Sequence, residues 1–203
     1  MENVTPSIEP VTEGQIGKFN QNVTARLLKH KAEIPSNLFQ QILGDTTLID
    51  EVHAAIRKRI DAMSNMITRV VSVNRKRYAQ QALDATGRKQ YVNSDVVIAM
   101  PSGEGEEAEV IFFKLGKYVS DANLDKEYDL RGLKPADPYS LAAVNEADPA
   151  FADEHPNCTH WKDAKGKWCF AAFDHWDGGR RSVDVSRDGG GWNDYWWFAG
   201  VRK

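Results

Sequence analysis

Histidine and cysteine side chains gather between residues 155 and 175, where they could bind a metal. Sulfur and imidazole groups suit zinc, and four of them can close a tetrahedral site. The candidates are His155, Cys158, His160, Cys169 and His175. Their spacing does not match a familiar zinc motif, and cysteines are commonly small core residues. We therefore expect no bound metal and no cofactor, and we keep a zinc-dependent enzyme as an alternative.

A hydrolytic site is a second chemistry to consider, because a carboxylate beside an imidazole can orient a general base. Asp174, His175 and Asp177 provide these groups. Adjacent residues on a strand point to opposite faces, so Asp174 and His175 would be poorly placed to act together. The sequence contains no nucleophile elbow, Walker loop or dinucleotide fingerprint. These observations predict that the protein is not an enzyme.

Tryptophans mark the C-terminal part of the chain, where all six lie between Trp161 and Trp197. Tryptophan combines a large apolar face with one donor, so such a cluster forms a dense small core or a contact surface. Short polar and amphipathic side chains accompany it, as in adaptable binding loops. The residues that we expect to contact a ligand are Asp174, His175, Trp176, Asp177, Ser182, Asp184, Ser186, Asp188, Asn193, Asp194, Tyr195 and Trp196.

Three segments are predicted as the strands that position these residues: 167–173, 181–188 and 196–202. The middle segment alternates most regularly, because Val183 and Val185 separate the polar residues at even positions. Successive side chains of a strand lie on opposite faces. The valines are therefore expected in a core, and Ser182, Asp184 and Ser186 are expected to face water or a partner. Arg180, Arg181 and Arg187 are expected to brace the loops by pairing with neighbouring carboxylates.

Residues 1–65 are predicted to form a small helical unit. Apolar residues between Ile16 and Leu27 recur at three- and four-residue steps, the period of one helix face. A short helix after Pro35 and a longer one that Asp45 caps show the same period. Small helical units often pair with another protein or with themselves. We therefore expect partner docking or homo-oligomerisation through these helices.

The pattern changes after the helical unit, where β-forming residues replace the helical period. Residues 69–73 are predicted as a strand, and the apolar run Val110–Phe113 as a buried strand. Short helices are predicted over residues 78–86 and near residues 140–145. This mixture predicts an α+β domain over residues 66–203.

The composition argues against several classes of partner. The chain of 203 residues is 41% hydrophobic and 27% charged, with a formal net charge of −3. This charge gives no general attraction to phosphate backbones or anionic membranes. No apolar stretch approaches the ~20 residues that span a bilayer, and no secretory signal is recognisable. We expect neither nucleic-acid binding nor membrane insertion, and a cytoplasmic location only by default.

The C-terminal segment resembles the variable end of target proteins of diversity-generating retroelements. The residues that carry the resemblance are Trp161-Lys162-Asp163, Trp168-Cys169-Phe170-Ala171-Ala172-Phe173, Arg180-Arg181-Ser182-Val183-Asp184-Val185, Trp192 and the ending Trp196-Trp197-Phe198-Ala199-Gly200-Val201-Arg202-Lys203. The resemblance implies a C-type-lectin-like, ligand-binding domain over residues 66–203, with a variable region at about 168–197. The ending departs from the Gly-Phe-Arg of better-known lectin-type members.

Two details bear on what the resemblance implies. In such systems a reverse transcriptase randomises adenines, and asparagine codons rewritten in this way yield Asp, His, Tyr, Ser, Gly or Arg, but never Trp, Lys or Glu. The polar positions of the expected contact set use these reachable residues.

Trp192-Asn193-Asp194 is similar to an element of calcium-dependent C-type lectins, but the accompanying carboxylates and amide are not evident, so no calcium is expected.

These observations predict an α+β protein in which a small N-terminal helical unit precedes a C-type-lectin-like mixed domain with a Trp-rich antiparallel sheet at its C-terminus. Its predicted function is non-enzymatic: binding or display of a protein or cell-surface ligand on a diversifiable strand face and its loops. A small phage or bacterial interaction module of unrelated fold is the alternative.

Overall fold

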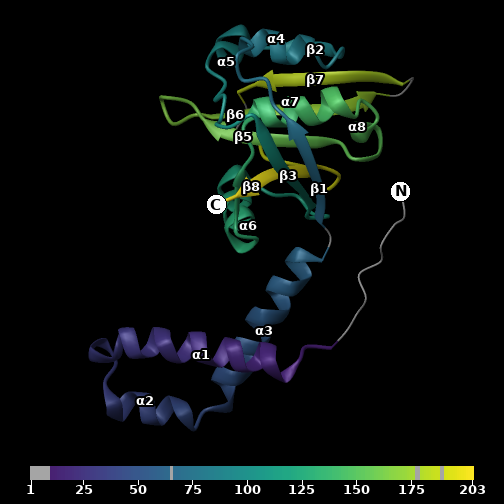
Figure 1. Cartoon of the computed structure of the whole chain (residues 1–203). Helices are drawn as coiled ribbons and strands as arrows, with labels where there is room; N and C mark the ends of the chain where they lie inside the picture. The colour runs from purple at the N-terminus through teal and green to yellow at the C-terminus, as the bar shows by residue number, and fades with distance from the viewer. Residues whose placement is uncertain (1–9, 65, 177–178, 188–189) are drawn as a thin grey trace. The chain divides into compact units, whose positions relative to one another are not determined.

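The computed structural model describes residues 10–64, 66–176, 179–187 and 190–203 (Figure 1). By its internal contacts the chain divides into two units, Met1–Ala55 and Ile56–Lys203. The architecture is α+β, with helices in the N-terminal region and a mixed eight-stranded sheet toward the C-terminus. The predicted fold class is thus confirmed.

Three α-helices form the N-terminal region, as the periodicity predicted: α1 Glu13–Lys29, α2 Ser36–Leu43 and α3 Thr46–Met63, with a 3₁₀ turn, η1, at Lys31–Glu33. A capping box starts α1, because the Thr12 side chain accepts from the Gln15 backbone and the Gln15 side chain accepts from the Thr12 backbone. Gly44 ends α2, and Asp45 accepts a hydrogen bond from the Thr47 backbone at the start of α3.

The eight strands of the second unit form one sheet in the order β1-β3-β8-β5-β6-β7-β2, with β4 paired to β8. Their bounds are β1 Met66–Ser72, β2 Lys89–Val92, β3 Glu107–Lys114, β4 Leu133–Pro135, β5 Asn157–Lys162, β6 Trp168–Trp176, β7 Arg180–Ser186 and β8 Trp197–Arg202. The strands β5, β6 and β7 are antiparallel, whereas β2 runs parallel to β7 and β5 parallel to β8. The sheet is therefore mixed rather than purely antiparallel.

Five helices connect these strands: α4 Ala79–Asp84, α5 Ser94–Ile98, α6 Asp121–Leu130, α7 Pro138–Ala147 and α8 Phe151–Glu154. On one face of the sheet, α7 contacts β1, β3 and β5, α8 contacts β6, and α5 contacts β7 (Figure 1). The main core lies here and includes Val110 and Phe112 of β3 together with Val183 and Val185 of β7. Helices thus cover this face from β1 across to β7.

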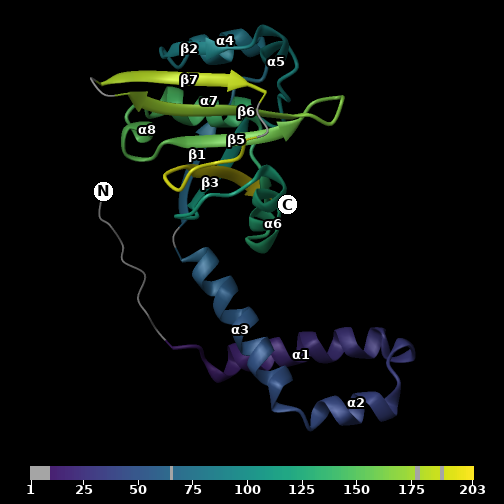
Figure 2. The same ribbon diagram turned by 180° about the vertical axis from the view of Figure 1, so that it is seen from behind.

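The opposite face is covered over only part of its width. Ile111 and Phe113 of β3 and Phe198 of β8 pack there with Leu124 and Tyr128 of α6. Seen from this side, β6 and β7 lie in front of α7, and no described helix lies over them (Figure 2). The sequence reflects the difference, because β3 is apolar on both faces and β7 is apolar on one.

Candidate functional site

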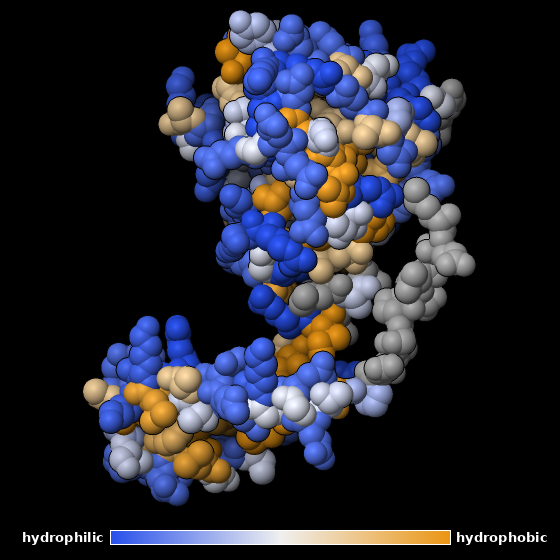
Figure 3. Space-filling view, in the orientation of Figure 1, coloured by the Kyte–Doolittle hydropathy of each residue, from blue (hydrophilic) through white to orange (hydrophobic). Residues whose placement is uncertain are grey.

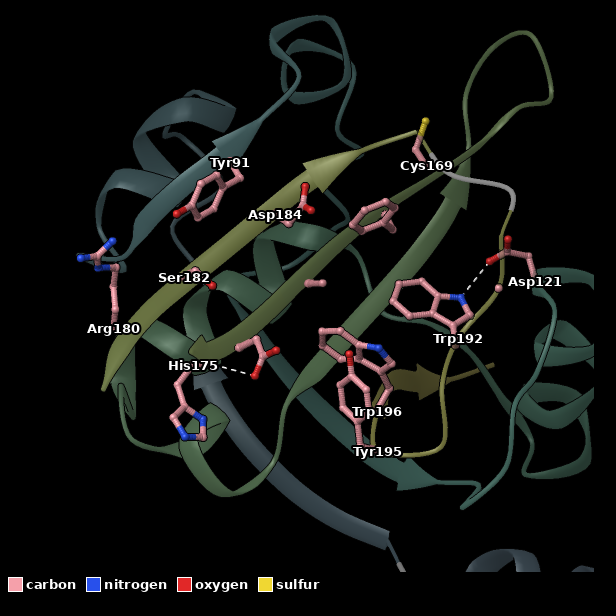
Figure 4. Close-up of a pocket in the computed structure, with 14 residues that line it drawn as sticks. Tyr91, Asp121, Cys169, His175, Arg180, Ser182, Asp184, Trp192, Tyr195 and Trp196 are labelled. Atoms are coloured by element: carbon pink, nitrogen blue, oxygen red, sulfur yellow. Dashed lines mark hydrogen bonds between the residues drawn. The ribbon is translucent and has the colours of Figure 1, made fainter. Parts of the chain in front are cut away.

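A hollow of about 1290 Å³ occupies the part of the sheet face that α6 leaves open. Its floor comes from β6 and β7, one edge from β2, and the other edge from the chain that precedes β8 (Figure 4). The lining residues are Tyr91, Asp121, Cys169, Phe170, Ala172, Asp174, His175, Arg180, Ser182, Asp184, Gly191, Trp192, Tyr195 and Trp196. Segments distant in the sequence therefore contribute to one concave surface.

The alternation of β7 places its side chains on two different surfaces. Val183 and Val185 have no exposed area and belong to the main core, as predicted. Ser182 and Asp184 lie on the other face and line the hollow. Ser182 is only 4% exposed, so the expectation that it faces open water is wrong. It lies in the floor of the hollow, between Lys89 of β2 and Asp174 of β6 in the sheet register.

Pairing with the neighbouring strands fixes the spacing of the polar groups. In the sheet register, Asp184 lies opposite Tyr91 of β2 and Ala172 of β6, while Ser182 lies opposite Asp174. Asp174 and Asp184 are thus diagonal neighbours on adjacent strands, with their Cα atoms roughly 7–8 Å apart. Two carboxylates and an aromatic ring therefore face the same space.

An aromatic wall closes the side of the hollow next to β8. Trp192 meets Phe170 edge-on at 5.6 Å between ring centroids and Trp196 at 5.7 Å, and Tyr195 packs on Trp196 at 5.0 Å. Trp192 is 7% exposed, whereas Tyr195 is 41% exposed. The wall thus has an anchored base and an accessible rim, which is the usual arrangement of an interaction hot spot.

Backbone pairing and a glycine hold the start of this wall in place. Trp192 and Val119 exchange two backbone hydrogen bonds of 2.8 and 3.0 Å, which ties the wall to the chain before α6. Gly191 adopts a φ of +83°, and a Cβ atom there would lie 2.7 Å from the Val119 carbonyl oxygen. Only glycine fits both the angle and the approach.

A buried carboxylate joins this wall to the centre of the sheet. Asp121 Oδ1 accepts a hydrogen bond of 2.9 Å from Trp192 Nε1, and it lies 2.8 Å from His160 Nδ1 (Figure 4 shows the bond to Trp192). Burial raises the pKa of Asp121, but the hydrogen bonds from His160 and Trp192 outweigh that effect, so its pKa falls below the ordinary value. His160 is itself buried and stacks on Trp168 at 4.6 Å.

The negative charge of Asp174 affects the pKa of Tyr195 on the aromatic rim. Its Oδ1 accepts a hydrogen bond of 2.7 Å from the His175 backbone N–H. Burial raises the pKa of Tyr195, and the negative charge of Asp174 raises it further. This effect indicates that the carboxylate and the phenol share one environment. Arg180 contributes a cationic side chain to the same hollow.

The structure gathers half of the predicted contact set in the hollow, namely Asp174, His175, Ser182, Asp184, Tyr195 and Trp196. Asn193 and Asp194 are exposed just before Tyr195 without lining it, and Ser186 is partly exposed at the end of β7. Asp177, Asp188 and the side chain of Trp176 lie outside the described part of the chain.

Sequence reasoning missed several residues of the hollow. Tyr91 comes from β2, whose pairing with β7 joins segments far apart in the chain. Asp121 opens α6, where an acidic residue is also an ordinary helix start. Trp192 was named in the tryptophan cluster and in the resemblance, but it was not placed in the expected contact set. Arg181 does not brace a loop as predicted, because it donates to both oxygens of Asp153 in helix α8 at 2.6–3.1 Å. Arg187 donates to Asp163, which lies between β5 and β6, at 3.1 Å.

The residues considered for zinc are not brought together. Cys158 belongs to the core under α6, whereas Cys169 belongs to the main core. Burial raises the pKa of both thiols, which favours their protonated form. Within the described ranges, no group of three or more His, Cys, Asp or Glu side chains is arranged to hold a metal ion.

Among the described helices, none is both long and apolar enough to cross a membrane.

Comparisons of the chain with protein-family models, with curated proteins and with solved structures found no match.

Proposed function

We propose that the protein is a non-enzymatic binding protein that receives a segment of a protein or cell-surface ligand in the hollow on β6 and β7. The observation that carries the proposal is the half-covered sheet, which leaves polar and aromatic side chains open on one face. The opposite face of the same strands lies in the main core. The proposed binding surface is therefore backed by the main hydrophobic core.

The size and chemistry of the hollow support a macromolecular ligand. Its volume of about 1290 Å³ is larger than the roughly 300–1,000 Å³ of most small-molecule sites. Tyr195 and Trp196 supply the aromatic area that dominates binding energy at protein interfaces. Asp174, Asp184 and Arg180 supply charged groups around it, which give specificity rather than bulk affinity.

We further propose that this surface is diversified, as in the target proteins of diversity-generating retroelements, and that residues 66–203 are a C-type-lectin-like domain. The support is that successive side chains of β7 lie alternately on the open face and in the main core. Substitution of Asp184 or Ser186 changes the open face, while Val183 and Val185 keep the core. A varied binding surface needs such a separation, because core substitutions cost several kcal/mol.

The genomic neighbourhood tests diversification directly. We expect a reverse-transcriptase gene nearby, with a template repeat that matches the codons for about Trp168–Trp197 and differs only at adenines. An unrelated neighbourhood without such a repeat would refute diversification and would favour an interaction module that uses the same hollow with a fixed sequence.

Ligand binding is tested by selecting random peptides displayed on phage against the immobilised full chain. Peptides that bind in the hollow should lose about thirtyfold in affinity when Tyr195 is changed to alanine, the ~2 kcal/mol of a hot-spot residue. Tyr78 is the matched control, since it is 79% exposed and does not line the hollow. Equal loss with Tyr78→Ala, or no loss with Tyr195→Ala, would place binding elsewhere.

A further inference from the structure

Two carboxylates and two aromatic side chains meet in the open part of the hollow. Asp174 of β6 and Asp184 of β7 lie on its floor, and Tyr195 and Trp196 form the rim of the aromatic wall. Asp184 and Tyr195 are exposed, and Asp174 and Trp196 are partly exposed. A ligand in the hollow therefore contacts negative charge and aromatic area together.

Negative charge prevails in the hollow. Among the described residues that line it, three are aspartates, one is an arginine and one is a histidine. The carboxylate of Asp121 is held inside the fold by its contacts with Trp192 and His160. The guanidinium of Arg180, at the start of β7, points away from the aromatic wall (Figure 4). The two carboxylates on the floor therefore supply most of the charge that a ligand meets.

The side of the same unit that carries α7 presents a different surface. Hydrophilic side chains prevail there and surround small hydrophobic areas (Figure 3). Charged groups on this side pair with one another, as Arg77 does with Glu146 at 2.5 Å. Paired charges offer a ligand little unbalanced charge, so the chemistry of the hollow is the more selective of the two.

The Asp174 carboxylate acts on the aromatic rim. Burial raises the pKa of Tyr195, and the negative charge of Asp174 raises it further, because a second negative charge nearby disfavours the phenolate. The same field favours a positive charge placed between the carboxylate and the ring. A hydrogen bond of 2.7 Å from the His175 backbone N–H to Oδ1 holds the carboxylate to its own strand.

We propose that the hollow binds a basic side chain of its ligand, lysine or arginine, with the cation between the Asp174 carboxylate and the rings of Tyr195 and Trp196. This inference rests on the proposed function, because it specifies the ligand of the same hollow. A carboxylate forms charge-assisted hydrogen bonds with an ammonium or guanidinium group, and an aromatic face attracts a cation within about 6 Å of its centre. An acidic ligand would place like charges together.

Peptide libraries of defined charge test the ligand class. Phage libraries of short random peptides, identical except for a fixed central arginine, lysine, glutamine or glutamate, are selected separately against the immobilised full chain. The arginine and lysine libraries should yield the binders, and the affinity of these peptides should fall when Tyr195 is changed to alanine. Binding should also weaken as salt is added, because salt screens the attraction between the cation and the carboxylates.

Removal of one charge at a time tests the contact itself. Asp174→Asn keeps the shape and the Oδ1 acceptor, and it should weaken the selected basic peptides about tenfold. Asp129→Asn is the matched control, since Asp129 is an exposed carboxylate that does not line the hollow, and it should leave the affinity unchanged. Peptides in which citrulline replaces arginine, or acetyl-lysine replaces lysine, keep most of the side chain without its charge. They should bind the wild type and Asp174→Asn equally.

The two proposals fail in different ways. Peptides that need Tyr195 but come from the glutamine or glutamate libraries, or that ignore Asp174→Asn, would refute the basic side chain and leave the hollow as a binding site. Basic peptides whose affinity does not change with Tyr195→Ala, or a selection without any peptide that needs Tyr195, would refute both proposals.

Discussion

Removal of the Asp121 carboxylate should destabilise the C-terminal unit more than removal of any other carboxylate that lines the hollow. The group is buried, and one oxygen accepts from Trp192 Nε1 at 2.9 Å and lies 2.8 Å from His160 Nδ1. A hydrogen bond to a charged group contributes about 1.5–3 kcal/mol. Asp121→Ala also leaves two buried donors without their acceptor, so we expect a loss of about 3–5 kcal/mol in the free energy of unfolding.

The pH dependence gives this prediction a second readout. The pKa of Asp121 is lowered in the folded chain from its ordinary value of 3.8. Such a group stabilises the fold above pH 3.8, and its contribution is lost as the pH falls through the lower folded pKa. The difference in unfolding free energy between wild type and Asp121→Ala should therefore be constant from pH 7 to about pH 5 and should shrink below about pH 4.

Urea unfolding followed by tryptophan fluorescence measures both quantities. Asp129→Ala is a suitable control, because Asp129 is an exposed carboxylate of the same helix that pairs with Lys203. Surface ion pairs contribute about 0–1 kcal/mol, so this variant should lie close to the wild type. A loss below about 1 kcal/mol for Asp121→Ala, or a difference that does not shrink in acid, would refute the role assigned to the buried carboxylate.

Three further results are expected from the same geometry. Gly191→Ala should lower the free energy of unfolding by about 1–3 kcal/mol, because Gly191 has a positive φ and lies close to the Val119 carbonyl. Gly116→Ala is the control and should cost about 1 kcal/mol, because Gly116 has a positive φ but open space around it. Equal melting temperatures of the two variants would contradict this. Val183→Asn should prevent stable folding, while the nearby change Asp184→Asn should shift the melting temperature by only a few degrees, as differential scanning calorimetry would show. The Cys158 thiol is fully buried and its pKa is raised well above the ordinary value, so it should react with a thiol reagent at pH 8 only after unfolding; rapid labelling of the native chain would contradict its burial.

Periodicity in the sequence identified the elements in which the pattern of apolar and polar side chains shows directly which faces are buried. The β7 strand alternates because one face meets the main core, and β3 is a continuous apolar run because both of its faces are covered. The helix stops and caps at Gly44 and Asp45 are local effects, and they were predicted correctly. Each of these features leaves a pattern that can be read from neighbouring residues in the sequence.

The β5 strand was missed because its burial depends on distant partners. Its polar residues Asn157 and Thr159 show no apolar alternation in the sequence, yet both are buried in the middle of the sheet. Asn157 Oδ1 accepts a hydrogen bond of 2.9 Å from Asn145 of α7, and Thr159 donates to the carbonyl of Ala136. Such partners become visible only when the fold is known, because a buried polar group is tolerated only where it is paired.

The same dependence on distant partners limited the prediction of the site. Polar residues at alternate positions of β7 indicated an open face, but nothing local to β7 indicates that Tyr91 and the Trp192 wall enclose it. The limit of that open face is set by α6, which covers the sheet beside β8 and β5 and leaves β6 and β7 uncovered. Strands in the covered part of the sheet, such as β3, are apolar on both faces. Strands in the uncovered part, such as β7, are apolar on one face only. The change in pattern from β3 to β7 therefore marks the edge of the region that α6 covers, and the hollow lies beyond that edge.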